Sequence, residues 1–188
     1  MKDTAIVFAR APRLGAVKRR LAAEIGDRAA LRFHTANLSR LLRALARDRR
    51  FQTLVAVTPD RAFIRLPHGV ARIAQGRGDL GARMARALAR FRRGRAVLLG
   101  CDIPDAGAAD VRAALRALGR DDAVFGPAED GGYWLVGFGP RRVFRPFAPV
   151  RWSGPHALAD TLARFGARRV ARLRQLADVD VAADLQAS

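Results

Sequence analysis

The sequence has a single cysteine and is short of acidic residues, with 17 Asp+Glu against 35 Lys+Arg in 188 residues. One cysteine excludes an internal disulfide and is compatible with a reducing compartment. No apolar run approaches the roughly 20 residues of a membrane span. The first residues also lack the charged-then-apolar pattern of a secretory leader. We therefore expect a cytoplasmic protein without a membrane span.

The formal charge of +18 admits two interpretations. A polyanionic partner such as nucleic acid, acidic lipid or a phosphorylated ligand is one of them. Compositional bias is the other, because Lys2 and Lys18 are the only lysines and the arginines are scattered along helical faces. We attribute most of the charge to bias, which still attracts anionic substrates. Aromatic residues make up 7% of the chain, too few for a stacking platform, so specific nucleic-acid binding is not expected. A non-catalytic basic module that binds nucleic acid is kept as an alternative.

Half of the residues are hydrophobic, which excludes disorder, and no linker or repeat divides residues 1–188. We therefore expect one domain. Strand-like and helix-like segments alternate, which predicts a three-layer α/β/α sandwich around a mostly parallel sheet. Residues 133–138 follow the preceding strand too closely for a crossover, so the sheet is expected to be mixed. The predicted strands are 4–9, 51–58, 70–75, 96–100, 123–126, 133–138 and 168–173, and the predicted helices are 18–26, 28–48, 80–91, 108–118 and 155–165.

Several of the scarce acids come shortly after an apolar run. Asp102 follows residues 96–101, Asp130 follows residues 123–127, and Asp178 and Asp180 come after residues 170–173. Carboxylates at the ends of buried parallel strands point into the crevice where open α/β sheets bind ligands. Mg²⁺ prefers one or two carboxylates with phosphate oxygens and water. Asp102 and Asp180 are therefore candidate metal ligands, although Asp180 is also explained as a helix N-cap.

The segment from Phe8 to Leu21 predicts a strand, a Pro/Gly loop and a helix start with cations at Lys18, Arg19 and Arg20. The free amides of a helix start, together with these charges, favour an anion there. The segment matches neither the GxxxxGK[ST] phosphate loop nor GxGxxG. An ordinary turn with surface cations explains the residues equally well.

Two further loops and the cysteine each have a structural explanation beside a functional one. Gly78-Asp79 suits close approach to a ligand, while Asp79 is also a good helix N-cap. Asp130-Gly131-Gly132 could face an acceptor with its amides, yet Asp-Gly is a common hairpin turn. A cysteine at the end of a buried strand is usually inert packing, so catalysis by Cys101 is not expected.

Taken in order, these segments resemble a bacterial glycosyltransferase A-like family. The chain is similar to phospholactate guanylyltransferases and, more remotely, to molybdenum-cofactor nucleotidyltransferases. Arg19 departs from the usual Thr of this pattern, and Gly154 stands where Thr often follows Trp-Ser. The motifs are F-x-[KR]-x-P-x-x-G-x-V-K-T-R-L at Phe8 to Leu21, G-D-L-G-x-R-M at Gly78 to Met84, G-x-D-x-P at Gly100 to Pro104, D-G-G-Y-x-L-x-G at Asp130 to Gly137, W-S at Trp152-Ser153 and D-x-D at Asp178 to Asp180.

The resemblance implies a nucleotide-diphospho-sugar transferase fold, a Mg²⁺ or Mn²⁺ ion, and a nucleotide or nucleotide-sugar donor. Nucleotidyl transfer to a phosphorylated, anionic small acceptor is the favoured reaction, with a glycosyltransferase as the alternative. A homo-oligomer stays open. The residues implied are Lys18, Asp102 and Asp130 for catalysis; Arg10, Pro12, Gly15, Lys18, Arg20, Gly78 and Asp79 for the donor; Gly131, Gly132, Tyr133, Trp152 and Ser153 on the acceptor side; and Asp102 and Asp180 for the metal.

Overall fold

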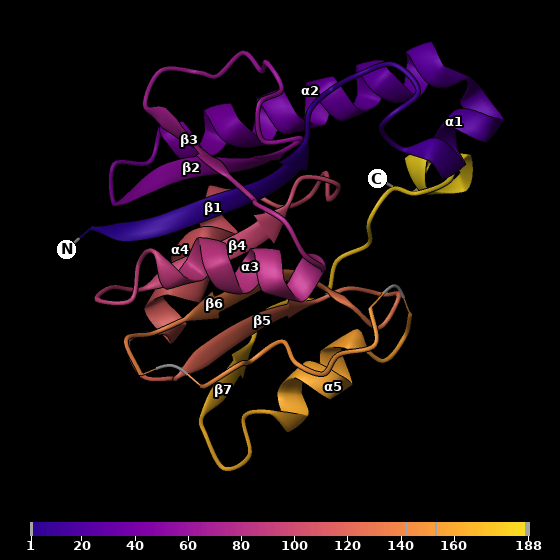
Figure 1. The fold of residues 1–188 in the computed structure, drawn as a ribbon. Helices are drawn as coiled ribbons and strands as arrows, with labels where there is room; N and C mark the ends of the chain where they lie inside the picture. The colour runs from indigo at the N-terminus through magenta and orange to yellow at the C-terminus, as the bar shows by residue number, and fades with distance from the viewer. Residues whose placement is uncertain (1, 142, 153, 187–188) are drawn as a thin grey trace.

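A mixed β-sheet crosses the middle of the structure, with helices on both of its faces (Figure 1). The structure is a computed structural model that describes residues 2–141, 143–152 and 154–186. Its elements in chain order are β1 (Asp3–Arg10), α1 (Arg19–Ile25), α2 (Asp27–Ala46), β2 (Phe51–Thr58), β3 (Val70–Ala74), α3 (Leu80–Ala89), β4 (Ala96–Gly100), α4 (Ala108–Ala117), β5 (Ala123–Pro127), β6 (Tyr133–Phe138), α5 (Ala157–Ala163), β7 (Val170–Arg172) and the 3₁₀ helix η1 (Ala182–Gln186).

The strand order in the sheet is β3-β2-β1-β4-β6-β5-β7. β1 pairs in parallel with β2 and with β4, while β6 runs antiparallel to both β4 and β5. The predicted mixed, mostly parallel sheet is therefore confirmed. The chain extends from β1 toward β3 on one side and returns to β4 on the other. The β1/β4 boundary is thus a topological switch point, where folds of this class bind ligands beyond the strand ends.

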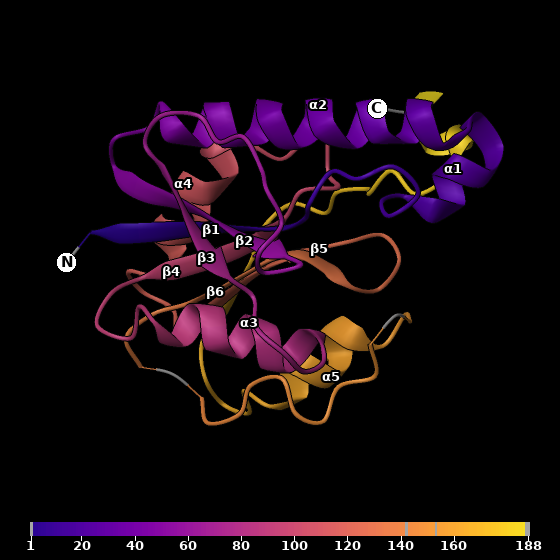
Figure 2. The same ribbon diagram turned by 45° about the horizontal axis from the view of Figure 1, so that its top comes forward.

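The sandwich is held together by one apolar layer on each face of the sheet. Figure 2 shows α2 and α4 over one face, and α3 with α5 over the other. Leu38, Leu41, Leu42 and Leu45 form the apolar stripe of α2 and pack on the first face. Met84 and Leu88 of α3 pack on the second. β1, β2 and β4 are covered on both sides, which explains why their sequences are continuous apolar runs rather than alternating ones.

A third, smaller cluster attaches the C-terminal segment to the start of the chain. Leu21 of α1, Ala30 of α2 and Val179 are all buried and pack together. The amide of Ala182 donates to Glu24 Oε2 at 2.8 Å, so η1 lies beside α1 (Figure 1). The residues flanking Val179 are thereby carried next to the β1–α1 turn.

Most element boundaries agree with the predictions to within one or two residues. β2 and β6 match their predicted ranges, and Asp79 caps α3 by accepting from the amide of Ala82 at 2.7 Å. Helix α5 begins at Ala157 after His156, two residues later than predicted. Ser153 lies outside the described residues. Among the described helices, none has both the length and the apolarity needed to cross a membrane.

Gly137 in β6 tests how tightly the sheet centre is packed. A Cβ there would lie 2.7 Å from Val97 Cγ1 and 2.9 Å from Val124 Cγ1, closer than carbon atoms approach. We expect Gly137→Ala to lower the free energy of unfolding by about 1–3 kcal/mol through overpacking. Gly100→Ala is the matched control, because no atom lies within 4 Å of its added Cβ. Urea denaturation of both variants measures the difference, and equal stabilities would contradict this account of the core.

Candidate functional site

The side chain of Lys18 joins two carboxylates from distant parts of the chain. Its Nζ lies 3.2 Å from Asp102 Oδ1 and 3.0 Å from Asp180 Oδ1. The Lys18 side chain is 4% exposed, whereas those of Asp102 and Asp180 are 45% and 44% exposed. Arg20 adds a weaker contact, with its guanidinium 3.7 Å from Asp180 Oδ2. The site is therefore a buried ammonium under two carboxylates that face an open cleft.

The backbone around each acid sets this geometry. Asp102 follows β4, and the carbonyl of Cys101 beside it accepts a 2.7 Å hydrogen bond from the buried amide side chain of Asn37 in α2. The amide of Val179 donates to the carbonyl of Asp102 at 3.2 Å, which places Asp180 beside Asp102. Lys18 has a left-handed backbone, with φ of 48°, at the N-cap of α1. Such a conformation is uncommon for a side-chain-bearing residue and here turns the chain toward the two acids.

The charges at this site support one another. Burial lowers the pKa of Lys18, but the charges and hydrogen bonds of Asp102 and Asp180 outweigh it, and the net pKa lies above its ordinary value. Burial raises the pKa of Asp102, but contact with His34 and Lys18 outweighs it, and the net pKa is lowered. Lys18 and Asp102 are therefore both charged near neutral pH.

The cleft around Lys18 measures about 460 Å³ and lies over the ends of β1, β2, β3 and β4. Gln75 closes its floor. Its side-chain amide donates to the carbonyls of Ala9 and Ala56, and its Oε1 accepts from Arg83 at 3.1 Å. This network presents the Arg83 guanidinium to the end of the cleft beyond Lys18. The lining residues are Phe8, Ala9, Arg10, Ala16, Val17, Lys18, Arg19, His34, Thr58, Gln75, Leu80, Arg83, Cys101, Asp102 and Asp180.

The sequence-predicted donor residues divide into two groups. Arg10, Lys18 and the two metal candidates line the cleft, and Arg20 lies at its edge through Asp180. The other predicted donor residues have structural roles: Pro12 lines a different hollow with Leu38 and Phe63, Gly15 turns the chain with φ of 70°, and Gly78 and Asp79 form the turn and cap before α3.

The acceptor-side prediction needs a correction at Gly131 and Gly132. Their amides were expected to face an acceptor, but the amide of Gly132 donates to Asp130 Oδ1 at 2.8 Å and that of Gly131 donates to Ala128. A Cβ on Gly131 would overlap the backbone of Pro155. These glycines thus satisfy a tight turn packed on the segment before α5. The pKa of Asp178 is raised first by burial, then by the charge of Asp180 and then by the charge of Asp130. Asp130 therefore lies near the site.

Tyr133 and Trp152 also have packing roles that the sequence did not reveal. Tyr133 stacks edge-on against Phe125 at 5.3 Å and against Trp152 at 6.4 Å, and its hydroxyl contacts Thr161 at 3.4 Å. Trp152 packs over Gly81, whose Cβ would come within 2.8 Å of the indole. Both aromatic residues lie on the α3/α5 face and are absent from the described lining of the cleft around Lys18.

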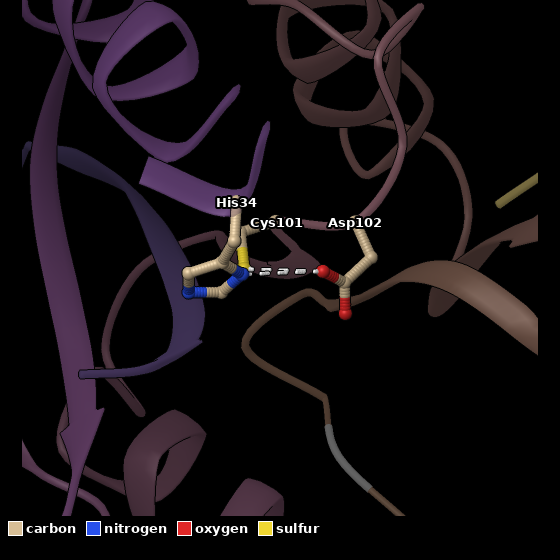
Figure 3. Close-up of side chains that lie close together, drawn as sticks. All are labelled: His34, Cys101 and Asp102. Carbon is tan, nitrogen blue, oxygen red and sulfur yellow. Dashed lines mark hydrogen bonds and ion pairs between the residues drawn. The ribbon is translucent and has the colours of Figure 1, made fainter. Parts of the chain in front are cut away.

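Sequence reasoning missed His34, Gln75 and Arg83. His34 is on α2 and 4% exposed, with Nδ1 3.7 Å from Asp102 Oδ1 (Figure 3). Its signal in the sequence was a polar residue on the apolar face of a predicted helix, a feature that it shares with Asn37. Arg83 stands inside the G-D-L-G-x-R-M motif, but its contact with Gln75 depends on the folded loop.

The residues present fit a divalent cation. Asp102 and Asp180 already converge on one full positive charge, the Lys18 ammonium, and their outer halves are open to the cleft. His34, Cys101 and Asp102 also form a group whose candidate ligand atoms lie within 4.8 Å of one another.

This arrangement defines the class of the protein. It is a transferase with the GT-A-like nucleotide-diphospho-sugar transferase fold and its cleft at the β1/β4 switch point. The chain belongs to the family described as "Uncharacterized protein conserved in bacteria (DUF2064)", whose model matches residues 41–154. No curated protein matches the sequence.

Solved structures agree with this assignment. A protein from Desulfovibrio desulfuricans G20, described as a proposed nucleotide-diphospho-sugar transferase, is 30% identical with a TM-score of 0.88, covering 96% of this chain and 84% of its own. A 4-diphosphocytidyl-2C-methyl-D-erythritol synthase from Anaerococcus prevotii DSM 20548 is 11% identical, covers 98% and 95%, and has a TM-score of 0.62. A Mycobacterium tuberculosis H37Rv protein in complex with manganese is 21% identical, covers 100% and 97%, and has a TM-score of 0.53. The last two show the fold alone.

Replacing Lys18 tests the electrostatic core of the site. Lys18→Met leaves Asp102 and Asp180 facing each other, and we expect it to lower the free energy of unfolding by about 1–2 kcal/mol at neutral pH. The value is below that of a fully buried pair because water screens both carboxylates. The ordinary pKa values are 3.8 for Asp102, lowered here, and 10.5 for Lys18, raised here. The difference in the free energy of unfolding between Lys18→Met and the parent should therefore shrink as pH falls below about 3.8 or rises above about 10.5.

Lys2→Met is the control for this prediction, because Lys2 is exposed and is the only other lysine. Urea denaturation across a pH series gives the two stability profiles. A Lys18→Met effect that is independent of pH would mean that packing, rather than charge, explains the loss.

Proposed function

We propose that this protein transfers a nucleotidyl group from a nucleoside triphosphate to a phosphorylated small acceptor. The observation that carries the proposal is the buried Lys18 ammonium held between Asp102 and Asp180 in the cleft beyond β1 and β4. In the reaction an acceptor phosphate oxygen forms a bond to the donor α-phosphorus. The bond from that phosphorus to the bridging oxygen breaks, and pyrophosphate leaves with its electron pair.

Lys18 serves this chemistry because its position is set before the donor binds. An ammonium has three N–H donors, and contacts with Asp102 and Asp180 direct two of them. The third N–H can donate a hydrogen bond to a phosphate of the nucleoside triphosphate. The buried stem restricts the ammonium to one place. Little rearrangement of Lys18 is therefore needed when negative charge develops in the transition state.

Arginines surround this point on the cleft walls. Arg10 at the end of β1 and Arg19 at the start of α1 line the cleft, and so does Arg83 of α3, whose guanidinium Gln75 holds. Donor-only side chains along the cleft suit the phosphates of a nucleotide and an anionic acceptor. Because the attacking acceptor oxygen already carries negative charge, the reaction needs no dedicated general base.

A divalent ion bound by Asp102 and Asp180, Mg²⁺ or Mn²⁺, would supply charge neutralisation of the donor phosphates. The two carboxylates come from different segments of the chain and would hold the ion between them. Val179 sets that convergence through its hydrogen bond to the Asp102 carbonyl. Asp130, near Asp178, adds a further negative charge at the rim toward β5 and β6.

Glycosyl transfer from a nucleotide-sugar is the second candidate, and the description of the Desulfovibrio desulfuricans G20 relative favours it. The same cleft would hold the diphosphate, which would then be the leaving group. The residues that neutralise phosphate are shared by the two reactions, so the products distinguish them.

The two reactions differ in the product released. With a nucleoside triphosphate, nucleotidyl transfer releases pyrophosphate, whereas glycosyl transfer from a nucleotide-sugar releases a nucleoside diphosphate. We expect pyrophosphate release with phosphorylated acceptors, and at least about a hundredfold lower kcat for Lys18→Met, because a preorganised charge is lost. Lys2→Met should keep full activity. Release of nucleoside diphosphate alone would reject nucleotidyl transfer and support the second candidate.

Metal-dependent donor binding can be measured without turnover. Nucleotides that bind the folded state raise its melting temperature, and we expect a larger rise in the presence of Mg²⁺ or Mn²⁺. Asp102→Asn should lose the metal-dependent part of this rise. Asp105→Asn is the matched control, because this exposed acid lies in the same loop and outside the cleft lining. If Asp102→Asn retains the full metal-dependent rise, Asp102 does not hold the metal.

A further inference from the structure

His34 contacts Asp102 in a way that an uncharged imidazole and a carboxylate alone do not explain. Its Nε2 lies 3.1 Å from the carbonyl oxygen of Arg10, which can only accept a hydrogen bond, so Nε2 carries the ring proton. In the neutral ring Nδ1 then has a lone pair, and this lone pair faces Asp102 Oδ1 at 3.7 Å. Either a proton on Nδ1 or a metal ion held between Nδ1 and Oδ1 makes this contact favourable, and a metal titration distinguishes the two.

Cys101 brings a third ligand atom to the same place. Its Sγ lies 3.8 Å from Asp102 Oδ1, and the candidate ligand atoms of His34, Cys101 and Asp102 lie within 4.8 Å of one another. Figure 3 shows the imidazole and the carboxylate facing each other, with the sulfur beside the ring. Nitrogen, sulfur and oxygen ligands of one transition-metal ion are roughly 3–4.5 Å apart, given metal–ligand distances near 2.0–2.3 Å. The spacing of these atoms therefore fits a single ion with little rearrangement.

We propose that His34 Nδ1, Cys101 Sγ and Asp102 Oδ1 form a binding site for a divalent transition-metal ion that prefers Co²⁺ or Zn²⁺ to Mg²⁺. Imidazole nitrogen and thiolate sulfur favour such ions, whereas Mg²⁺ prefers oxygen ligands alone. Three protein ligands leave further coordination positions, and these face the cleft because Asp102 is 45% exposed. This site shares Asp102, but not Asp180, with the Mg²⁺ or Mn²⁺ site proposed above. The inference rests on the proposed function only in placing the ion beside a donor phosphate.

The neighbouring charges accommodate the ion. Lys18 contacts both Asp102 and Asp180, so it can lose its contact with Asp102 and keep the 3.0 Å contact with Asp180. Asp102 and Asp180 balance the charges of Lys18 and Arg20. Before the ion binds, Cys101 is a free thiol. When the ion binds, the thiol proton passes to solvent and the sulfur becomes a thiolate ligand.

Visible spectroscopy during titration with Co²⁺ alone, without any nucleotide, tests the site. We expect ligand-field bands and a thiolate-to-cobalt charge-transfer band to saturate with one equivalent of Co²⁺. An excess of Mg²⁺ at least tenfold over Co²⁺ should not displace it. The expected order of affinity follows the general preference of nitrogen and sulfur ligands for late first-row metals.

His34→Gln is the central variant, because a glutamine amide can still donate to the Arg10 carbonyl while Nδ1 is removed. We expect it to weaken Co²⁺ binding by at least about tenfold. Cys101→Ser should abolish the charge-transfer band and provides a second variant that leaves α2 unchanged. His68→Gln and His156→Gln are matched controls, since both of these histidines are exposed and should leave the spectrum unaltered.

Three results would overturn the proposal: absence of the charge-transfer band in the parent protein, unchanged Co²⁺ affinity in His34→Gln, or equal competition by Mg²⁺. The first two would point to an imidazolium that simply pairs with Asp102. None of them bears on nucleotide turnover, and loss of turnover without loss of Co²⁺ binding would reject the proposed function while leaving this site intact.

Discussion

The contact between Lys18 and the carboxylates of Asp102 and Asp180 is the interaction on which the rest of the site depends. It joins the β1–α1 turn, the end of β4 and the C-terminal segment. Without the ammonium, two negative charges would converge in a half-buried place. Without the carboxylates, a lysine that is 4% exposed would be buried without a partner. Each segment therefore makes the position of the others favourable.

The positive charge of the chain acquires a more specific meaning in this structure. Among the described residues, arginines also form structural pairs away from the cleft, such as Arg174 with Asp110 and Arg151 with Asp160. Those that matter for a phosphate-bearing ligand are the few that line the cleft. The two proposed reactions would share this donor-rich wall, so the chemistry of the site, rather than the fold, must decide between them.

Much of the fold was predictable, and the errors have physical causes. Strands β1, β2 and β4 are covered on both faces, so their apolar runs are unambiguous, and the short connection before β6 predicted its antiparallel direction. Asp102 and Asp180 were predicted as metal candidates from their places after strands, and Lys18 as a phosphate-binding candidate from its helix start and the family resemblance. The amides of Gly131 and Gly132 were misjudged, because a loop sequence does not show which hydrogen bonds its own turn consumes.

By itself, the sequence determined the layers of the sandwich and the residue types at the ends of its strands, because hydrophobic period and turn chemistry are local properties. Only the tertiary structure decided which of these residues meet. Val179 is buried against α1 and bonded to the Asp102 carbonyl, and this packing brings Asp180 to Lys18 across 162 residues of chain. His34 reaches Asp102 in the same way, through the packing of α2 on the sheet. Such convergence is a property of long-range packing, which no local pattern encodes.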